Sequence, residues 1–161
     1  MKRIVYDQTK CVGCRVCEAI CSFTKYHESN PTKARGKILR TVTDAFLTKI
    51  RITCLQCEKP MCMEICPASA ISENAEGVKI VDTEKCLGCR MCEIACPVGA
   101  IHVHPDMGTA VKCDQCMDED EPQCVKYCYS KALSFVDNER MGYVMAREKS
   151  STFLEKQAKE T

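Results

Sequence analysis

Alternating apolar and polar residues predict several short strands along the chain. Ile101-His102-Val103-His104 alternates as a half-buried strand does, and residues 133–136 follow a similar pattern. Residues 38–43 and 47–53 predict the two strands of a hairpin. A second hairpin is predicted within 71–82, where two strand-like runs flank a polar turn that contains a glycine. We therefore expect small antiparallel hairpins.

The predicted helices are short and coincide with closely spaced cysteines. Two residues that are four apart share one face of a helix. Glu18-Ala19-Ile20 and Glu93-Ile94-Ala95 each suit one helical turn between two such cysteines. No apolar run approaches the ~18 residues that a membrane-spanning helix needs. The pattern predicts an α+β fold with short helices, small antiparallel hairpins, much loop and no membrane span.

Composition and charge narrow the class of protein. Of the 161 residues 16 are cysteines, a density that is typical of disulfide scaffolds and of metal proteins. The N-terminus, Met1 to Lys10, has no apolar signal segment and no twin arginine. We therefore expect a cytoplasmic protein, where cysteines bind metal more readily than they form disulfides. With 23 basic and 22 acidic residues, the chain has no electrostatic footprint for nucleic acid.

The cysteines form an internal repeat of four quartets. Every quartet opens with C-x2-C and closes with C-x3-C, and the gap between these pairs is two, four, two and seven residues in turn. The metal-ligand candidates, quartet by quartet, are Cys11, Cys14, Cys17, Cys21; Cys54, Cys57, Cys62, Cys66; Cys86, Cys89, Cys92, Cys96; and Cys113, Cys116, Cys124, Cys128.

The third quartet, with Pro97 after it, has the cysteine spacing of bacterial two-cluster ferredoxins. A tight loop that carries C-x2-C-x2-C wraps three corners of a cubane, and the fourth cysteine, on the following helix, ligates the neighbouring cluster. Gly13 and Gly88 lie two residues after the first cysteine of their loops, where glycine allows close backbone approach. The sequence therefore predicts four 4Fe–4S clusters as cofactors.

Zinc is the main alternative, because paired C-x2-C elements also build zinc ribbons. A zinc site takes four ligands from two such elements, usually with a long spacer, and has no use for three cysteines at x2, x2 spacing. Two of the four quartets have that compact spacing. The pattern thus favours iron–sulfur clusters over zinc, and over a disulfide scaffold.

A thin hydrophobic core is expected. Tryptophan is absent and the large apolar residues are few for a chain of this length. Clusters that are bonded at many points would supply the missing internal cross-links, so we expect poor folding without them.

Residues near the quartets carry weaker signals. We expect His27, His102 and His104 not to bind metal, since the cysteines already complete four clusters. The segment Asp118 to Glu121 fills the long gap of the fourth quartet as a solvated loop or as a docking site for a basic partner. Four methionines lie beside ligand candidates and either shield clusters from water or fill gaps: Met61, Met63, Met91 and Met117.

Over about residues 1–140 the chain resembles the four-cluster electron-transfer subunits of molybdenum and tungsten oxidoreductases, such as formate dehydrogenase and dimethyl sulfoxide reductase. The segment Cys11 to Cys21, with His27, Asn30-Pro31 and Ala34-Arg35 after it, is most similar to the small subunits of tungsten aldehyde oxidoreductase complexes. The chain is also similar to the small subunit of tungsten benzoyl-CoA reductase and to subunits of hydrogen-dependent carbon dioxide reductase.

This resemblance implies how the quartets pair. An inner ferredoxin-like unit, 50–105, would be inserted into an outer unit made of 1–49 and 106–140, with a polar tail over 141–161. Ser22 and Tyr129 stand where a strict ferredoxin has proline, and we expect a locally changed turn at both. The implied ligand sets are Cys54, Cys57, Cys62 with Cys96; Cys86, Cys89, Cys92 with Cys66; Cys11, Cys14, Cys17 with Cys128; and Cys113, Cys116, Cys124 with Cys21.

No substrate site is predicted, because the chain has no glycine-rich dinucleotide loop, phosphate loop or nucleophile–base set. We expect a non-catalytic subunit that relays single electrons between a tungsten or molybdenum pterin subunit and a flavin subunit, a ferredoxin or further copies of itself. A freely diffusing polyferredoxin, a subunit of a hydrogenase, formate dehydrogenase or carbon dioxide reductase complex, and an assembly protein with structural clusters stay open. The tail is expected to become ordered on a partner.

Overall fold

Two-stranded antiparallel sheets carry most of the regular structure. The computed structural model describes residues 1–42, 47–139 and 142, and four such sheets lie within them. The pairs are β1 (Lys2–Tyr6) with β8 (Leu133–Asp137), β2 (Lys37–Val42) with β3 (Leu47–Ile52), β4 (Ile71–Glu73) with β5 (Lys79–Val81), and β6 (Ile101–Val103) with β7 (Ala110–Lys112).

The helices are short, and each lies within or directly after a cysteine quartet. Pro60 and Pro122 precede α2 and α4 as their N-cap residues, and proline is favourable there because its fixed φ suits the start of a helix. The helices are α1 (Val16–Tyr26), α2 (Met61–Glu64), α3 (Met91–Ala95) and α4 (Gln123–Lys126), with a 3-10 turn at Pro31–Lys33.

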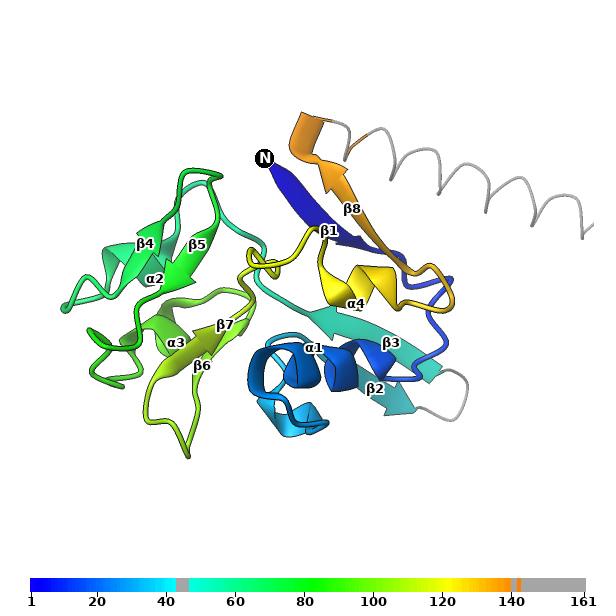
Figure 1. Ribbon diagram of the computed structural model, residues 1–161, viewed down its shortest axis with the longest axis horizontal. Coiled ribbons are helices and arrows are strands. Elements are labelled where there is room, and N and C mark those ends of the chain that lie inside the picture. The colour runs from blue at the N-terminus through cyan, green and yellow to red at the C-terminus, as the bar shows by residue number, and fades with distance from the viewer. Residues whose placement is uncertain (43–46, 140–141, 143–161) are drawn as a thin grey trace, which may run out of the picture.

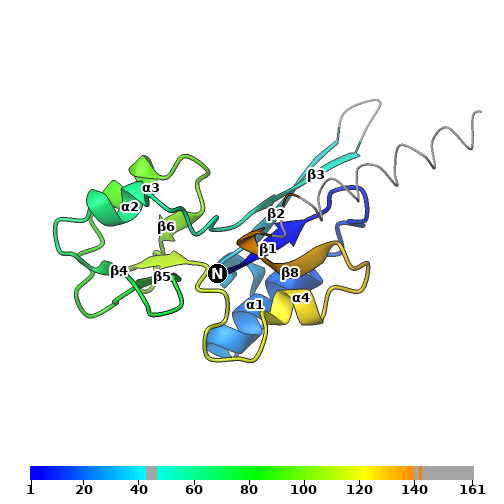
Figure 2. The same cartoon turned by 90° about the horizontal axis from the view of Figure 1, so that it is seen from above.

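These elements form two lobes, which both views separate (Figures 1 and 2). The middle lobe, residues 53–112, contains β4 to β7, α2 and α3. The end lobe, 1–42 with 47–52 and 113–139, contains β1, β2, β3, β8, α1 and α4. The β1–β8 pair brings the start of the chain beside residues 133–137, so the two chain-terminal parts of the described fold close the end lobe together.

The predicted strands are confirmed where the structure describes them. The hairpin over 38–43 and 47–53 is β2–β3, although 43–46 lie outside the described residues, and the hairpin within 71–82 is β4–β5. The strands at 101–104 and 133–136 are β6 and β8. The sequence pattern missed β1 and β7, because their residues show no clear alternation.

The predicted helical spacing is confirmed in only one quartet. Cys17 and Cys21 both lie on α1, whereas α2 and α3 end before Cys66 and Cys96. The expected unit boundary at 105/106 falls within the hairpin β6–β7, whose strands are hydrogen-bonded over 101–112. The predicted tail, 141–161, lies outside the described residues except for Gly142. Over the described residues no helix is long and apolar enough to cross a membrane.

Cysteine side chains make up much of the core. The hydrophobic cluster of the middle lobe consists of Ile71, Cys92, Ile101 and Ala110. Further thiols and a few larger apolar side chains pack against this cluster: Cys62, Cys66, Cys86 and Cys96, with Met63, Val81 and Val103. So few large apolar side chains give little hydrophobic stabilisation, in line with the thin core expected from the composition.

Candidate metal centres

A left-handed residue recurs in the opening loop of every quartet. The residue two positions after the first cysteine has a φ of 71° at Gly13, 52° at Gln56, 65° at Gly88 and 60° at Gln115. The two glycines were singled out in the sequence, but the two glutamines were missed because their side chains give no conformational signal. The four quartets therefore share one tight turn between their first two cysteines.

A second left-handed residue recurs three positions after the closing cysteine. Ser69, Gly99 and Lys131 have φ values of 49°, 62° and 52°. Their backbone N–H groups donate to the carbonyls of Cys66, Cys96 and Cys128 at 3.1, 3.2 and 3.0 Å. This turn follows the second, third and fourth quartets.

The two expected departures from this turn had different outcomes. At Ser22 the turn is changed as expected, because α1 continues to Tyr26 and the Ser22 hydroxyl donates to the Ala19 carbonyl at 2.9 Å. At Tyr129 the expectation was wrong. The turn there is the one that follows Pro67 and Pro97, so Tyr129 adopts it without the constraint of a proline ring.

Backbone N–H groups are aimed at six of the cysteine sulfurs. Hydrogen bonds to sulfur help to set the potential of a bound cluster. Donor and acceptor are separated by 3.3 to 3.4 Å in the pairs Gly13 with Cys11, Arg35 with Cys21, Ala70 with Cys66, Ala110 with Cys86, Ala100 with Cys96, and Gln115 with Cys113.

Two cavities in the middle lobe are each lined by four cysteines. The first contains Cys54, Cys57 and Cys62 of the second quartet together with Cys96 of the third. The second contains Cys86, Cys89 and Cys92 of the third quartet together with Cys66 of the second. Each cavity therefore combines three cysteines of one loop with the closing cysteine of the other.

In the end lobe, thiols of the first and fourth quartets approach one another. Cys113, Cys116 and Cys124 are buried. Burial raises the pKa of the Cys124 thiol to about 12, and the neighbouring Cys113, Cys21 and Cys116 act in the same direction. Cys21 comes from α1, which packs against α4. These four cysteines are thus neighbours although Cys21 and Cys124 belong to the first and last quartets of the chain.

The remaining four cysteines differ in burial, from the buried Cys11 to the exposed Cys14. Burial raises the pKa of Tyr6, and the adjacent Cys11 and Cys17 add to the effect, so both thiols lie beside this phenol. Cys14 is exposed. Cys128 is half-buried, with its Sγ 3.8 Å from the Ser130 hydroxyl oxygen.

Arg51 of β3 lies among the end-lobe thiols. Its Nη2 donates to Cys124 Sγ at 3.4 Å, whereas its buried Nε and Nη1 have no hydrogen-bond partner among the described residues. Burial opposes the charge of this guanidinium, but nearby Cys124, Cys17, Cys113 and Cys21 keep the pKa of Arg51 raised. Two buried donors without partners fit a site completed by an anionic group, such as a thiolate-ligated cluster with its sulfides.

A buried amine lies where the two lobes meet. Lys112 lines the first middle-lobe cavity and donates to the Lys79 carbonyl and, at 3.1 Å, to the Cys113 carbonyl. The fully buried Gln56 also reaches both segments, since its Nε2 donates to the Cys113 carbonyl at 2.8 Å and its Oε1 accepts from Lys79 N–H at 2.9 Å. The loop of Cys54 is therefore tied directly to the loop of Cys113.

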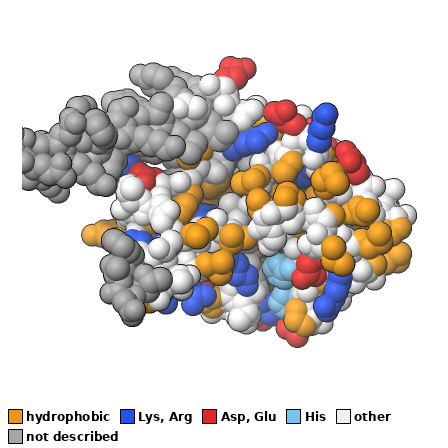
Figure 3. All heavy atoms as spheres, turned by 180° about the vertical axis from the view of Figure 1, so that it is seen from behind, with side chains coloured by type: hydrophobic (Ala, Val, Ile, Leu, Met, Phe, Trp, Pro, Cys, Tyr) orange, Lys and Arg blue, Asp and Glu red, His pale blue; other side chains and the backbone are white. Residues whose placement is uncertain are grey.

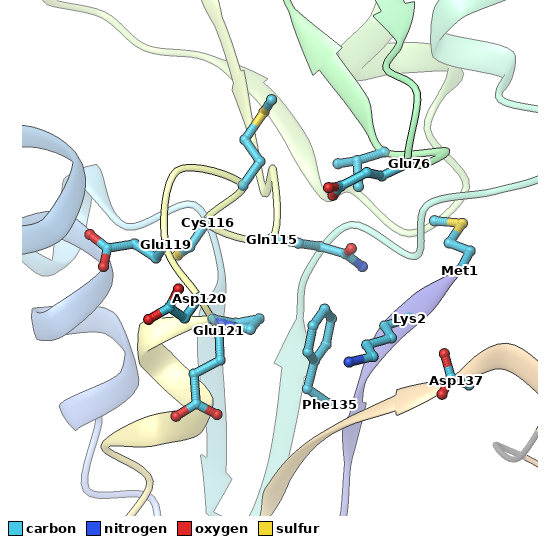
Figure 4. A pocket seen from close by; sticks show the side chains of 13 residues that line it. Met1, Lys2, Glu76, Gln115, Cys116, Glu119, Asp120, Glu121, Phe135 and Asp137 are labelled. Carbon is cyan, nitrogen blue, oxygen red and sulfur yellow. The ribbon is translucent and has the colours of Figure 1, made fainter.

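The acidic segment Asp118 to Glu121 is partly paired within the protein. Lys25 bridges Asp118 at 3.2 Å and Asp114 at 2.8 Å, and Arg35 also binds Asp114, at 2.6 Å. The segment borders a cavity of about 450 Å³ between the ends of β1 and β8 and the loop that carries Cys116 (Figure 4). Five of its thirteen lining residues are acidic, and Lys2 also lines it.

The histidines and methionines lie in varied surroundings. His27 caps the C-terminus of α1, and the buried His104 accepts a hydrogen bond from Asp106 N–H at 3.2 Å. Met61 lines the first middle-lobe cavity. Figure 3 shows hydrophobic side chains gathered on the middle-lobe side of one face. The exposed apolar residues of that lobe include Leu55, Met61, Ile65, Leu87, Met91 and Ile94.

Within the described residues, the potential metal ligands do not surround a single ion. Over residues 1–42, 47–139 and 142, no three His, Cys, Asp or Glu side chains form a group that could hold one metal ion. In the middle lobe the cysteines instead line cavities in fours. Together with the repeated loops, the N–H groups aimed at sulfur and the unpartnered Arg51 donors, the cysteine-lined cavities define a ferredoxin-type iron–sulfur protein.

The comparisons with known proteins identify the family. Residues 46–138 match the family described as the 4Fe-4S dicluster domain, and the protein belongs to it. It is 39% identical over 163 residues to uncharacterized ferredoxin MJ0155 of Methanocaldococcus jannaschii, covering 99% of this protein and 97% of that one. It is 32% identical over 145 residues to the B subunit of anaerobic dimethyl sulfoxide reductase from Escherichia coli strain K12, covering 80% and 70%.

A solved structure also resembles this protein. The BamBC active site complex of benzoyl coenzyme A reductase with 1,5-dienoyl-CoA contains a chain that is 29% identical, with a TM-score of 0.48, over 84% of this protein and 75% of that chain. The family and the relatives establish an iron–sulfur electron-transfer protein, as the sequence predicted.

Proposed function

We propose that this protein is the electron-transfer subunit of an oxidoreductase complex and that it holds four 4Fe–4S clusters. When bound, each cluster supplies a one-electron redox couple. The polypeptide ligates the clusters, fixes their positions relative to one another and excludes water from their buried sides. The B subunit of dimethyl sulfoxide reductase, a relative that spans most of this protein, is by name part of an oxidoreductase, and this supports such a partner.

The proposed ligand sets exchange the closing cysteine between paired quartets. In the middle lobe, Cys96 completes the set of the second quartet and Cys66 that of the third. In the end lobe, Cys21 completes the set of the fourth quartet and Cys128 that of the first. The end-lobe sets contain Cys113, Cys116, Cys124 with Cys21, and Cys11, Cys14, Cys17 with Cys128.

The observation that carries this proposal is the lining of the two middle-lobe cavities. Each has three cysteines from one quartet and one from the other, which is the exchange that two-cluster ferredoxins require. The neighbouring thiols of Cys21, Cys113, Cys116 and Cys124 support the same exchange in the end lobe. For the set completed by Cys128, the support is the repeat itself.

The two lobes correspond, in this proposal, to two ferredoxin-like units, one inserted in the other. We place the inserted unit at about 53–112, somewhat longer than 50–105, because β7 is hydrogen-bonded to β6 and belongs with it. The ties from Gln56 and Lys112 to the Cys113 carbonyl hold the units together where a middle-lobe set and an end-lobe set approach one another. Such contact favours a continuous electron path through the protein.

Isolation of the native complex without oxygen tests the function. We expect the protein to co-purify with a catalytic subunit that contains tungsten or molybdenum, and the clusters to bleach when that subunit's substrate is added. Nickel in place of these metals would indicate a hydrogenase partner. A protein that carries iron but elutes as a monomer, without partner, would contradict the subunit role and support a freely diffusing polyferredoxin.

A further inference from the structure

We propose that Arg51 raises the reduction potentials of both end-lobe clusters, because its guanidinium lies between the two ligand sets and donates into them. The inference rests on the proposed function, since it assumes that those clusters are bound. It assigns to one side chain of β3 an effect on both clusters of the end lobe. The middle-lobe clusters would be outside its influence.

The position of Arg51 is the first argument. Its Nη2 contacts Cys124 Sγ at 3.4 Å, and Cys124 belongs to the fourth quartet. Burial raises the pKa of Cys17, a ligand of the first quartet's set, and that of Cys21. The charge of the same guanidinium opposes this rise at both thiols. Arg51 therefore lies beside ligands of both end-lobe sets, although the cysteines of these sets come from opposite ends of the sequence.

The hydrogen-bonding state of Arg51 is the second argument. Nε and Nη1 are buried and have no partner within the described part of the protein. Two buried donors without partners are costly, since each unsatisfied N–H loses its hydration. The sulfides and thiolates of a bound cluster would be acceptors for these donors, and the planar fork of arginine can reach two groups at once.

The third argument is that the backbone leaves space for this side chain. A Cβ atom at Gly36 would lie 3.0 Å from Arg51 Nη2 and 3.2 Å from Thr53 Oγ1. Gly36 has no side chain to occupy that space, so the Arg51 guanidinium packs against the backbone just before β2 and does not extend into solvent. The placement of Arg51 is thus built into the packing of the hairpin.

The expected sign of the effect follows from electrostatics. Reduction adds one negative charge to a cluster, and a buried positive charge nearby stabilises the reduced form. Hydrogen bonds to sulfur act in the same direction. Removing the guanidinium should therefore lower the potentials of the two end-lobe clusters.

The test is a redox titration of the anaerobically purified full-length protein, with reduction by dithionite and detection by electron paramagnetic resonance. Arg51→Met should lower the ratio of reduced to oxidised cluster at least tenfold at a fixed potential for two of the four components. For a one-electron couple that is a shift of about 59 mV. The other two components should stay where they are in the unmodified protein.

Lys2→Met is the control, because Lys2 lies on β1 of the same lobe, is exposed and has its ammonium over the Phe135 ring. It removes one positive charge from the end lobe but should change no ratio more than about twofold, since solvent screens exposed charges. If Lys2→Met shifts the same components as much as Arg51→Met does, the inference is overturned. An Arg51→Met protein with four clusters and unchanged potentials overturns it too.

Arg51→Lys keeps the inference testable should Arg51→Met lose iron. It preserves the charge without the planar fork, so we expect the same two components to shift in the same direction by less than tenfold. Potentials equal to those of the unmodified protein would refute a contribution from the hydrogen bonds of the guanidinium, because lysine keeps the charge. If instead the unmodified protein lacks the end-lobe clusters by iron analysis, the proposed function fails, and the inference with it.

Discussion

In the proposed ligation, the two lobes hold their clusters in different surroundings. In the middle lobe the cysteines are packed with apolar side chains such as Ile71 and Ile101, and the buried Lys112 lies at the edge of one cavity. In the end lobe they are surrounded by charges, with Arg51, the fully buried Glu18 and the Lys25–Asp114–Arg35 group close by. One loop geometry can therefore serve clusters of different potential, because the surroundings rather than the loop differ.

The lobes also differ in the length of their strands and helices. The strands of the middle lobe are three residues long, whereas those of the end lobe have five or six, and α1 has eleven. The middle lobe thus has fewer backbone hydrogen bonds to hold it together without its clusters. We expect its fold to depend more strongly on iron.

Cluster removal should have the largest effect on stability, and this effect should differ between the two lobes. After treatment with an iron chelator without oxygen, amide hydrogen exchange should lose protection throughout β4 to β7, because the cysteine-lined cavities lose their cross-links. Some protection should remain in β2–β3 and α1. Equal loss in both lobes would mean that the difference in strand length has no consequence for stability.

Paired substitutions test the exchange of closing cysteines in the middle lobe. Cys57→Ser combined with Cys96→Ser should cost about four iron atoms per protein, because both residues belong to one proposed set. Cys89→Ser combined with Cys96→Ser should cost about eight, because these residues belong to two sets. Iron analysis gives the answer directly. Ligation by whole quartets would reverse the two results.

A glycine pair in the middle lobe tests the tight opening turn. Gly88 has a φ of 65°, and a Cβ there would overlap the Gly108 carbonyl oxygen, so Gly88→Ala should destabilise by about 3 kcal/mol. Gly99 has a φ of 62° but nothing within 4 Å, so Gly99→Ala should cost about 1 kcal/mol. Anaerobic urea unfolding of the cluster-bound protein measures both, and equal costs would contradict the close approach.

A smaller effect than that of Gly88→Ala is expected at Glu18, which joins α1 to β2 in the end lobe. Its carboxylate accepts from Ile38 N–H at 2.5 Å and from Arg15 at 2.6 and 2.7 Å. Glu18→Ala leaves the buried Ile38 N–H unsatisfied and should destabilise by about 2 kcal/mol. Glu18→Gln keeps an acceptor and should cost less in the same unfolding experiment. A larger cost for Gln than for Ala would contradict this account.

The sequence was a good guide to the cysteines and the hairpins. Spacing identifies the quartets, and alternation identifies β2 to β6 and β8, since both are local patterns. The left-handed φ at Gln56 and Gln115 was missed because only the fold forces these residues into the turn. Arg51 was missed for a related reason: an arginine within a strand pattern carries no sign that its guanidinium will lie among cysteines from both ends of the sequence.

Iron and acid-labile sulfide, measured together on the protein purified without oxygen, test the central claim most directly. Four 4Fe–4S clusters require about sixteen iron and about sixteen sulfide per protein. About eight of each would mean that only one lobe binds clusters, and would contradict the equivalence of the four quartets. Zinc with little iron or sulfide would contradict the iron–sulfur assignment altogether.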